Sequence, residues 1–361
     1  MFRAVLKLIK YLVLILLIPL SIEIWLRVQD TYRLRNAQEI KDSSLRATAD
    51  YKRIIGKSLS DYLRRSLSKG VEYELRPYIV GDFLGQSIKI NKYGMRDSET
   101  QLKRESKCFR VMGLGDAVMF GWGVSESESY PSLVERQLSS SLGCVDFLNF
   151  GTPGFNTSQE VSLYRTKGQY FNPDLLILHF RDDDIGLPMY VSTQILPFSL
   201  SKSYALEALC GKLGNNIKSL FEWCESSRKV ELVDTLPPEK ISLVKKRYYS
   251  KTGIEGVQES LVDLAELSKK KNTKILVVFS GASNANKTRV ISTAQNLGMH
   301  TLDIKPYVEK YIKQINIPNN HEARRRVLCL SSKDCHPSRD GHKIYAEAIK
   351  EYILSHHLLN N

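Results

Sequence analysis

Two near-continuous apolar runs constrain the fold of this chain more than any other feature. They read DLLILHF over residues 174–180 and KILVVFS over residues 274–280. A strand carries apolar side chains on both sides when both faces of its sheet are covered, as in a parallel sheet flanked by helices. Helical patterns separate these runs from three further strand patterns, so strands and helices alternate along the chain. The sequence therefore predicts an α/β fold around a doubly wound parallel sheet.

The expected elements of this fold follow from the positions of the apolar runs and turn residues. Five strands are expected, over Phe109–Leu114, Val145–Phe150, Asp174–Phe180, Lys274–Ser280 and His300–Ile304. Five helices are expected, over Tyr130–Ser141, Ser158–Tyr170, Pro238–Lys270, Asn286–Leu297 and Asp340–His356.

The N-terminus begins MFRAVLKLIKYLVLILLIPLSIEIWLRVQD. A helix over residues 11–26 rises roughly 24 Å at 1.5 Å per residue, and a bilayer core is about 30 Å thick. The helix becomes long enough to cross the bilayer core if residues 5–9 join it and the side chains of Lys7 and Lys10 extend to the interface. No small-residue cleavage site follows the apolar run. Residues 1–27 are therefore predicted to be a transmembrane signal anchor, with a cleaved signal peptide or a buried soluble helix as alternatives.

The rest of the chain divides by composition. Residues 28–70 are polar and charged, which is typical of a juxtamembrane stalk. Residues 71–105 hold short alternating stretches around turns, and a small β lead-in is expected there. Residues 106–361 carry the strand–helix alternation, interrupted by an insertion over about residues 185–236.

All six cysteines lie beyond the predicted anchor and fall into three pairs that are local in sequence. An even number in this arrangement suits an oxidising compartment. The predicted disulfides are Cys108–Cys144, Cys210–Cys224 and Cys329–Cys335, and six buried free thiols are the alternative. The charges that flank the apolar run do not decide its orientation. The cysteines favour a single-pass membrane protein whose C-terminal domain is extracytoplasmic, in the periplasm or at the cell surface.

The formal net charge of the chain is +13 at pH 7. Neither zinc-finger spacing nor an RNA-binding signature accompanies the basic residues, so a nucleic-acid partner is not expected. Together with the N-terminus, the charge favours an anionic membrane surface or an anionic cell-envelope polymer.

Four blocks of the sequence carry a family resemblance. They read RVMGLGDAVMFGWGV, NFGTPGFNT, LHFRDDDIG and DCHPSRDGH. In order and spacing they resemble the SGNH/GDSL hydrolase superfamily, and the final block is similar to its membrane-anchored bacterial polysaccharide O-acetylation branch. The resemblance covers roughly residues 107–354. It implies a flavodoxin-like, three-layer α/β/α sandwich and a serine esterase or acyltransferase site.

The resemblance assigns a role to each matched position. Ala117 occupies the place of the nucleophilic serine, Gly151 or Gly154 matches the glycine that donates to the oxyanion, and Asp183 occupies the place of the asparagine that also donates. Asp334 and His336 match the aspartate and histidine of the triad. The chain thus departs from the family pattern at two of its functional positions.

Both departures weaken the implied chemistry. Alanine offers no nucleophile, and loss of the serine from such a triad costs on the order of a million-fold in rate. An ionised carboxylate about 4 Å from a developing oxyanion would cost roughly 4 kcal/mol at an effective dielectric constant of 20. A protonated Asp183 could still donate, and Asp182 and Asp184 beside it would favour the protonated form.

Other polar groups near these blocks have simpler interpretations. The hydroxyls of Ser125, Ser127, Ser129 and Thr152 suit caps and turns. His179 lies inside a strand and suits a core position. The carboxylates of RDDD, residues 181–184, suit solvent or arginine pairing, although a hard cation stays an alternative. Neither a metal nor an organic cofactor is expected.

Two functions follow, from different classes. In the first, the chain is a catalytically silent member of the group that binds a cell-envelope glycan, an acyl ester or a partner protein in the ancestral cleft. In the second, it is a serine esterase or polysaccharide O-acyltransferase whose nucleophile has been replaced in this chain, with a membrane acyltransferase as a candidate partner. The intact Asp334 and His336 favour the second function and Asp183 favours the first, while a change of chemistry is a third possibility.

Overall fold

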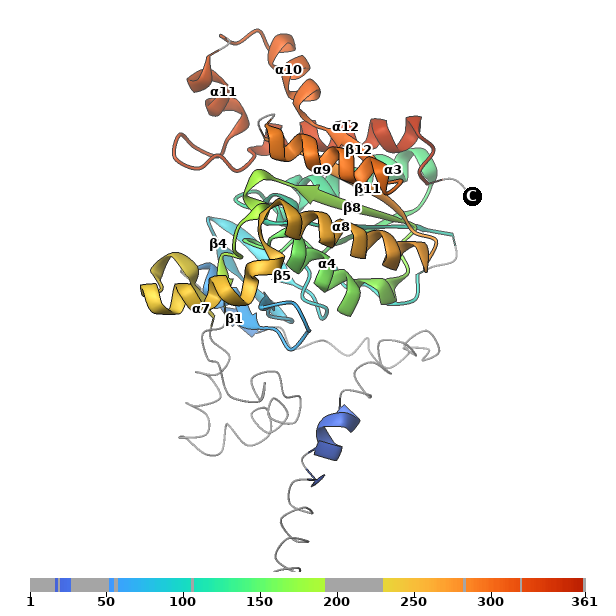
Figure 1. Cartoon of the computed structure of the whole chain (residues 1–361). Coiled ribbons are helices and arrows are strands. Elements are labelled where there is room, and N and C mark those ends of the chain that lie inside the picture. Colours follow the sequence, from blue (N-terminus) through green and yellow to red (C-terminus); the bar gives the residue numbers. More distant parts are fainter. Residues whose placement is uncertain are drawn as a thin grey trace, which may run out of the picture.

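The computed structural model describes residues 17–18, 20–26, 52–54, 58–104, 107–191, 230–281, 284–318 and 320–359. A five-stranded sheet lies at its centre (Figure 1). Its strands are β6 (Phe109–Leu114), β7 (Val145–Asn149), β8 (Leu175–Phe180), β11 (Lys274–Phe279) and β12 (His300–Asp303). All pair in parallel, in the order β12-β11-β8-β6-β7. This is the flavodoxin-like strand order, so the predicted fold class is confirmed.

Two layers of helices cover the two faces of the sheet. Helices α3 (Tyr130–Leu142) and α12 (Arg339–Ser355) pack on one face, and α4 (Thr157–Thr166), α8 (Gly253–Lys269) and α9 (Ala285–Asn296) on the other. The side chains of β8 alternate between the two cores. Leu176 and Leu178 join the core under α4 and α8, whereas Leu175 and Ile177 join the core under α3 and α12. Burial on both faces explains why this strand reads as a continuous apolar run.

Shorter elements complete the described chain. The remaining helices are α2 (Ala117–Phe120), α7 (Pro238–Tyr248), α10 (Lys305–Gln314) and α11 (His321–Leu328). Short 3₁₀ helices cover Leu59–Tyr62, Glu126–Glu128, Gly168–Phe171, Asp182–Ile185, Val233–Thr235 and Tyr249–Lys251. Helices α10 and α11 lie away from the sheet, at the top of Figure 1. The sequence analysis did not anticipate either of them.

The single helix predicted over Pro238–Lys270 is wrong. The structure ends α7 at Tyr248 and begins α8 at Gly253. Thr252 between them is extended, and Gly253 has a φ of +73°. A side chain is strained in that left-handed conformation, so the glycine marks the break.

The lead-in is built from two small sheets. Strand β4 (Ile79–Phe83) pairs with β1 (Lys52–Ile54) in parallel and with β5 (Gln86–Ile90) in antiparallel orientation. Strands β2 (Leu63–Arg65) and β3 (Tyr73–Leu75) form an antiparallel pair. Strands β1 and β2 precede Val71, so ordered structure begins inside the segment that was expected to be a stalk.

The predicted insertion is described only at its two ends. There β9 (Tyr190–Val191) pairs with β10 (Glu231–Leu232) in antiparallel orientation, which closes the base of the insertion. Cys210 and Cys224, predicted to form a disulfide, lie outside the described residues.

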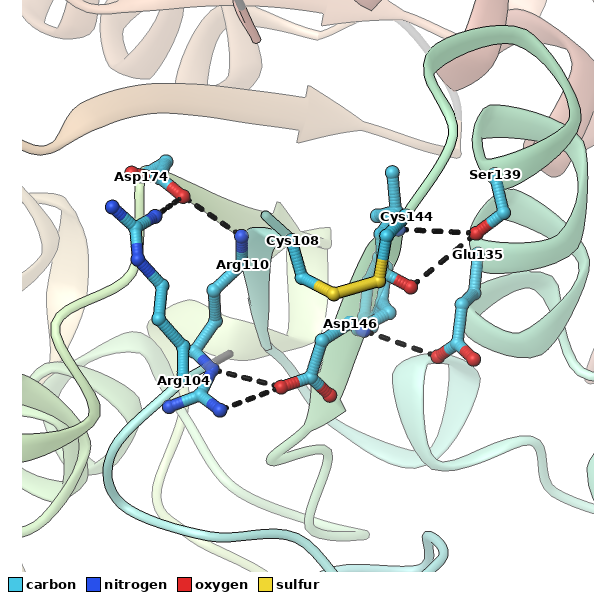
Figure 2. The surroundings of a disulfide bond; sticks show 10 residues. Arg104, Cys108, Arg110, Glu135, Ser139, Cys144, Asp146 and Asp174 are labelled. Atoms are coloured by element: carbon cyan, nitrogen blue, oxygen red, sulfur yellow. Dashed lines mark hydrogen bonds and ion pairs between the residues drawn. A yellow bond between two sulfur atoms is a disulfide. The ribbon is translucent and has the colours of Figure 1, made fainter. Parts of the chain in front are cut away.

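Two of the three predicted disulfides are present, Cys108–Cys144 and Cys329–Cys335. Figure 2 shows the first, which joins the residues that precede the neighbouring strands β6 and β7. Buried Arg110 lies beside it and forms an ion pair with Asp146 at 2.7 Å. The Arg110 amide donates to Asp174 at 2.8 Å, at the start of β8. The disulfide and these polar contacts thus align the amino-terminal ends of β6, β7 and β8.

The predicted anchor, residues 1–27, lies largely outside the described residues. Residues 17–18 and 20–26 are helical and expose apolar side chains, including Trp25 at 57%. None of the helices in the described part of the chain combines the length and the apolarity that a membrane crossing requires.

A buried ion cluster fastens the lead-in to the main domain. Glu74 on β3 accepts from Arg64 on β2 at 2.7 Å and from Lys167, at the end of α4, at 2.9 Å. Burial acts to raise the pKa of Glu74, but the charges of Lys167 and Arg64 outweigh it and lower that pKa from 4.5 to about 2. The carboxylate therefore stabilises the folded state.

We predict that Glu74→Gln lowers the free energy of unfolding at pH 7 by about 3 kcal/mol, the equivalent of the pKa shift. The loss should shrink as the pH falls from 4.5 to 2, because protonation removes the same charge from the parent chain. Urea unfolding across this pH range measures the effect. Glu231→Gln, which breaks an exposed ion pair with Lys240, is the control and should cost less than about 1 kcal/mol. Equal losses from the two substitutions would contradict the prediction.

Candidate active site

The candidate site lies where the strand order of the sheet reverses. Strands β6 and β8 are neighbours, but the chain leaves β6 toward β7 on one side and leaves β8 toward β11 on the other. Loops at the carboxyl ends of two such strands diverge and leave a crevice. Asp116 and Ala117 follow β6, and Asp183 follows β8. The sheet topology itself therefore brings these residues together.

A cavity of about 590 Å³ opens at this edge of the sheet. Four of the residues predicted for the site line it, namely Ala117, Gly154, Asp183 and His336. The other lining residues are Asp116, Trp122, Pro153, Phe155, Leu187, Pro188, Met189, Val233, Asp234, Ile241 and Lys245. The volume lies within the range of small-molecule binding sites.

Asp334 and His336 form the hydrogen-bonded pair that the last sequence block predicts. His336 Nδ1 lies 2.6 Å from Asp334 Oδ1, and the His336 amide donates to the same oxygen at 3.0 Å. Partial burial acts to raise the pKa of Asp334, but the bonds from His336 outweigh it and hold that pKa below its ordinary value. A carboxylate only accepts, so Nδ1 carries the hydrogen and, in the neutral imidazole, Nε2 has the lone pair. The imidazole is thus prepared to accept a proton or a hydrogen bond.

Trp122 supports this pair, a role that was not predicted from the sequence. Its indole Nε1 donates to Asp334 Oδ2 at 3.2 Å, and its ring stacks on His336 with centroids 5.0 Å apart. Phe83 of the lead-in packs edge-on against the indole, with centroids also 5.0 Å apart. The only sequence signal was a tryptophan in GWGV, directly after the first block. The lead-in therefore reaches the site through Phe83 and Trp122.

The two candidate oxyanion glycines have different surroundings. The Gly151 amide donates to Asn149 Oδ1 at 3.0 Å, and a Cβ at Gly151 would lie 2.3 Å from the Phe120 nitrogen. Gly151 thus permits close packing against α2 and does not line the cavity. Gly154 does line it, with a φ of +77°. Of the two glycines, Gly154 is the one that lines the cavity.

Asp183 is paired with an arginine. Arg181 Nε lies 3.0 Å from Asp183 Oδ1 and 3.5 Å from Asp116 Oδ2. Asp183 Oδ1 accepts from Arg181 Nε, so this oxygen acts as an acceptor and not as a donor. Burial raises the pKa of Asp116, although Arg181 acts in the opposite direction. The carboxyl groups of Asp116 and Asp183 therefore lie together on the lining of the cavity.

Groups that could replace the missing serine are bonded elsewhere. The Ser129 hydroxyl donates to the Glu126 carbonyl at 2.7 Å, and the Thr152 hydroxyl to the Phe150 carbonyl at 3.4 Å. Neither lines the cavity, and neither do Ser125 and Ser127. His179 is buried, where its Nε2 lies 2.9 Å from the Ser280 hydroxyl, and burial lowers the pKa of His179 to about 3. His179 thus occupies the core position that was expected. Ser125 and Ser129 stand at N-cap positions, but neither makes the side-chain cap hydrogen bond that was expected of them.

No family model and no curated protein matches this chain. Solved structures similar to it include a protein described as lipolytic and of the G-D-S-L family, from Desulfitobacterium hafniense. It is 13% identical, with a TM-score of 0.37 over 67% of this chain and 98% of that chain. An acetylxylan esterase catalytic mutant from Geobacillus stearothermophilus is 14% identical, with a TM-score of 0.40 over 68% and 94% of the two chains. An α/β hydrolase enzyme from the Lake Arreo metagenome is 11% identical, with a TM-score of 0.42 over 72% and 99%.

The fold itself is assigned from the strand order of this chain, and the site from its own contacts.

The disulfide Cys329–Cys335 closes a short loop that carries Asp334, and His336 follows it directly. Leu330 and Ser331 donate their amides to the carbonyls of His336 and Asp334, at 3.0 and 3.1 Å. Cross-linking a loop of seven residues stabilises it by about 2 kcal/mol in the chain-entropy model. The disulfide therefore holds both members of the pair in place.

We predict that replacing Cys329 and Cys335 together by alanine speeds amide exchange at Leu330 and Ser331 by roughly 30-fold, the equivalent of about 2 kcal/mol. Hydrogen exchange followed by mass spectrometry of residues 328–338 measures it. Replacing Cys108 and Cys144 by alanine is the matched control and should leave exchange in this loop unchanged. Unchanged exchange in the first variant would show that the backbone bonds alone hold the loop.

Proposed function

We propose that this chain is a membrane-tethered, SGNH hydrolase-like protein that binds an acylated cell-envelope glycan without hydrolysing it. The observation that carries the proposal is the contrast across one cavity. The Asp334–His336 pair is assembled and His336 lines the cavity, while Ala117 and Asp183 line the same cavity at the positions where the family resemblance implies a nucleophile and an oxyanion donor. A cavity that keeps groups for binding but lacks the groups for catalysis is suited to binding a ligand without converting it.

The cavity offers contacts that a glycan can use. Trp122, stacked on His336, supplies a flat apolar surface that suits the face of a sugar ring. Asp234 and Lys245 also line the cavity and bring one charge of each sign for hydroxyl, carboxylate or ester oxygens. The proposed site thus combines an aromatic surface with a few polar groups, as ligand cavities commonly do.

The proposed location follows from the sequence and the cysteines. The apolar N-terminus would tether the chain, and disulfides such as Cys108–Cys144 persist in oxidising compartments outside the cytoplasm. A domain held there would meet cell-envelope glycans, and a membrane acyltransferase that modifies them is the partner we propose.

We predict that the purified chain binds O-acetylated peptidoglycan more tightly than the same material after alkaline removal of its esters. His336→Gln and Trp122→Phe should weaken binding by about 10-fold or more, because each removes one polar group from the network around the cavity. Sedimentation of the chain with the insoluble glycan measures the effect. Tyr249→Ala, which alters a side chain that is 86% exposed and does not line the cavity, is the control. Equal binding by all variants would reject the cavity as the binding site.

The intact Asp334–His336 pair favours one other function, a serine esterase or O-acyltransferase whose nucleophile has been replaced in this chain. With serine at position 117, His336 would accept the hydroxyl proton while Asp334 orients the imidazole. The bond from the serine oxygen to the acyl carbon would then form, and the alcohol of the ester would leave.

Restoring the serine separates the two functions. We predict that Ala117→Ser alone recovers little hydrolysis of p-nitrophenyl acetate, because Asp183 opposes negative charge where it develops. Ala117→Ser with Asp183→Asn should exceed the single change by roughly 100-fold, the effect of one oxyanion donor. Asp183→Asn alone is the control and should be inactive. If Ala117→Ser alone hydrolyses the ester at an ordinary esterase rate, the proposal of a catalytically silent protein is rejected. The chain would then be an esterase or acyltransferase whose nucleophile has been replaced.

A further inference from the structure

Glu160 is the most unusual carboxyl group in the described chain. It lies in the first turn of α4, its residue is only 1% exposed, and neither of its carboxylate oxygens has a hydrogen-bond partner. Buried polar groups are nearly always bonded, because an unpaired one loses its water without compensation. A buried carboxylate with both oxygens unpaired is therefore expected to have a cation or a protonated group beside it.

Glu160 faces the acidic loop that follows β8. Asn156, which caps the helix of Glu160, donates to the Gly186 carbonyl at 2.9 Å, so the start of α4 packs against residues 182–186. Asp184 in that loop is 2% exposed, and its charge interacts with that of Glu160. Asp184 Oδ2 accepts from the Arg181 amide at 2.8 Å, but Asp184 Oδ1 is buried without a partner. Asp184 Oδ1 and both oxygens of Glu160 are thus buried and unpaired, and the charges of the two carboxyl groups act on each other.

Two further carboxylates complete the cluster. Asp116, Asp183 and Asp184 each offer an oxygen, and these three atoms all lie within 4.8 Å of one another. Arg181 pairs with Asp183 and approaches Asp116, which compensates one negative charge among four. Its guanidinium contacts leave Asp184 Oδ1 and both oxygens of Glu160 unpaired. The cluster therefore has unpaired oxygen atoms and uncompensated negative charge that can bind a cation.

We propose that Asp116, Glu160, Asp183 and Asp184 bind a divalent cation of the size of calcium at the wall of the cavity. Calcium takes six to eight oxygen ligands at about 2.3–2.6 Å, so two of its ligands lie at most about 5 Å apart. Magnesium binds at about 2.0–2.1 Å, which limits that separation to about 4 Å. The three aspartate oxygens lie within 4.8 Å of one another, inside the calcium limit. Magnesium is usually held by only one or two carboxylates, so a cluster of four favours calcium.

The cation site also gives a reason for one departure from the family pattern. Asp183 stands where the resemblance implies asparagine, and an aspartate adds a full charge to the cluster. Asp116 and Asp183 line the cavity, whereas Asp184 and Glu160 are buried behind it. An ion held by both pairs would face the cavity and could take an oxygen from a ligand bound there. The site does not depend on the proposed glycan function, since the ion can bind without a ligand.

The test uses the purified full chain after treatment with a chelator. We expect calcium chloride to bind with one ion per chain in titration calorimetry. At calcium a hundred-fold above its Kd, the Tm should rise by about 5 to 10 °C. Magnesium should give a smaller rise at equal concentration. Glu160→Gln and Asp184→Asn, which keep the side-chain shape and remove the charge, should each abolish the response.

Glu135→Gln is the matched control, because Glu135 is a partly buried carboxyl on α3 that accepts from the Phe147 amide and lies outside the cluster. It should keep the response of the parent chain. Terbium luminescence on the parent chain, displaced by calcium, gives the stoichiometry even where a variant fails to fold. A parent chain whose Tm and heat do not respond to calcium would overturn the proposal and indicate that Glu160 and Asp184 hold protons instead. A response that survives Glu160→Gln and Asp184→Asn would also overturn it.

Discussion

The reversal of strand order between β6 and β8 is the constraint on which the rest of the site depends. Because the chain leaves these neighbouring strands in opposite directions, their carboxyl ends cannot be covered by one connection. Loops from β6, β7 and β8 meet there, together with the loop before α12 that carries His336. Residues more than 200 positions apart, such as Trp122 and Asp334, become hydrogen-bond partners at this point. The proposed glycan site and the proposed cation site both occupy that crevice.

Two groups of residues in the crevice differ in how they are held. A disulfide loop, an indole hydrogen bond and the lead-in residue Phe83 fix the imidazole of His336. The residues that follow β6 and β8 include several carboxylates, and Arg181 balances only part of their charge. An acyl-transfer site needs donors and a nucleophile in place of this second group. A site that binds cations and polar ligands can use carboxylates there, so the asymmetry supports binding rather than acyl transfer.

The sequence predicts the parts of this structure that depend on burial and periodicity. The five strands were located to within one residue, because buried strands are apolar runs bounded by turns. The break between α7 and α8 was missed because helical periodicity continues across Gly253, whose left-handed conformation is a property of the packed chain. Trp122 and Glu160 were missed for another reason. Their roles come from contacts with residues distant in sequence. A single amino-acid sequence does not show which distant residues come into contact when the chain folds.

The central claim is that His336 is retained without a nucleophile to activate, so it contributes nothing to turnover in this chain. The most direct measurement compares p-nitrophenyl acetate hydrolysis by the parent chain and by His336→Gln, at equal concentration and pH. Surface amines react with this ester in both proteins, so their contribution cancels in the difference. Our account predicts equal rates. A parent rate at least 10-fold above that of His336→Gln would contradict it, because His336 would then be acting as a base in a reaction that this chain performs.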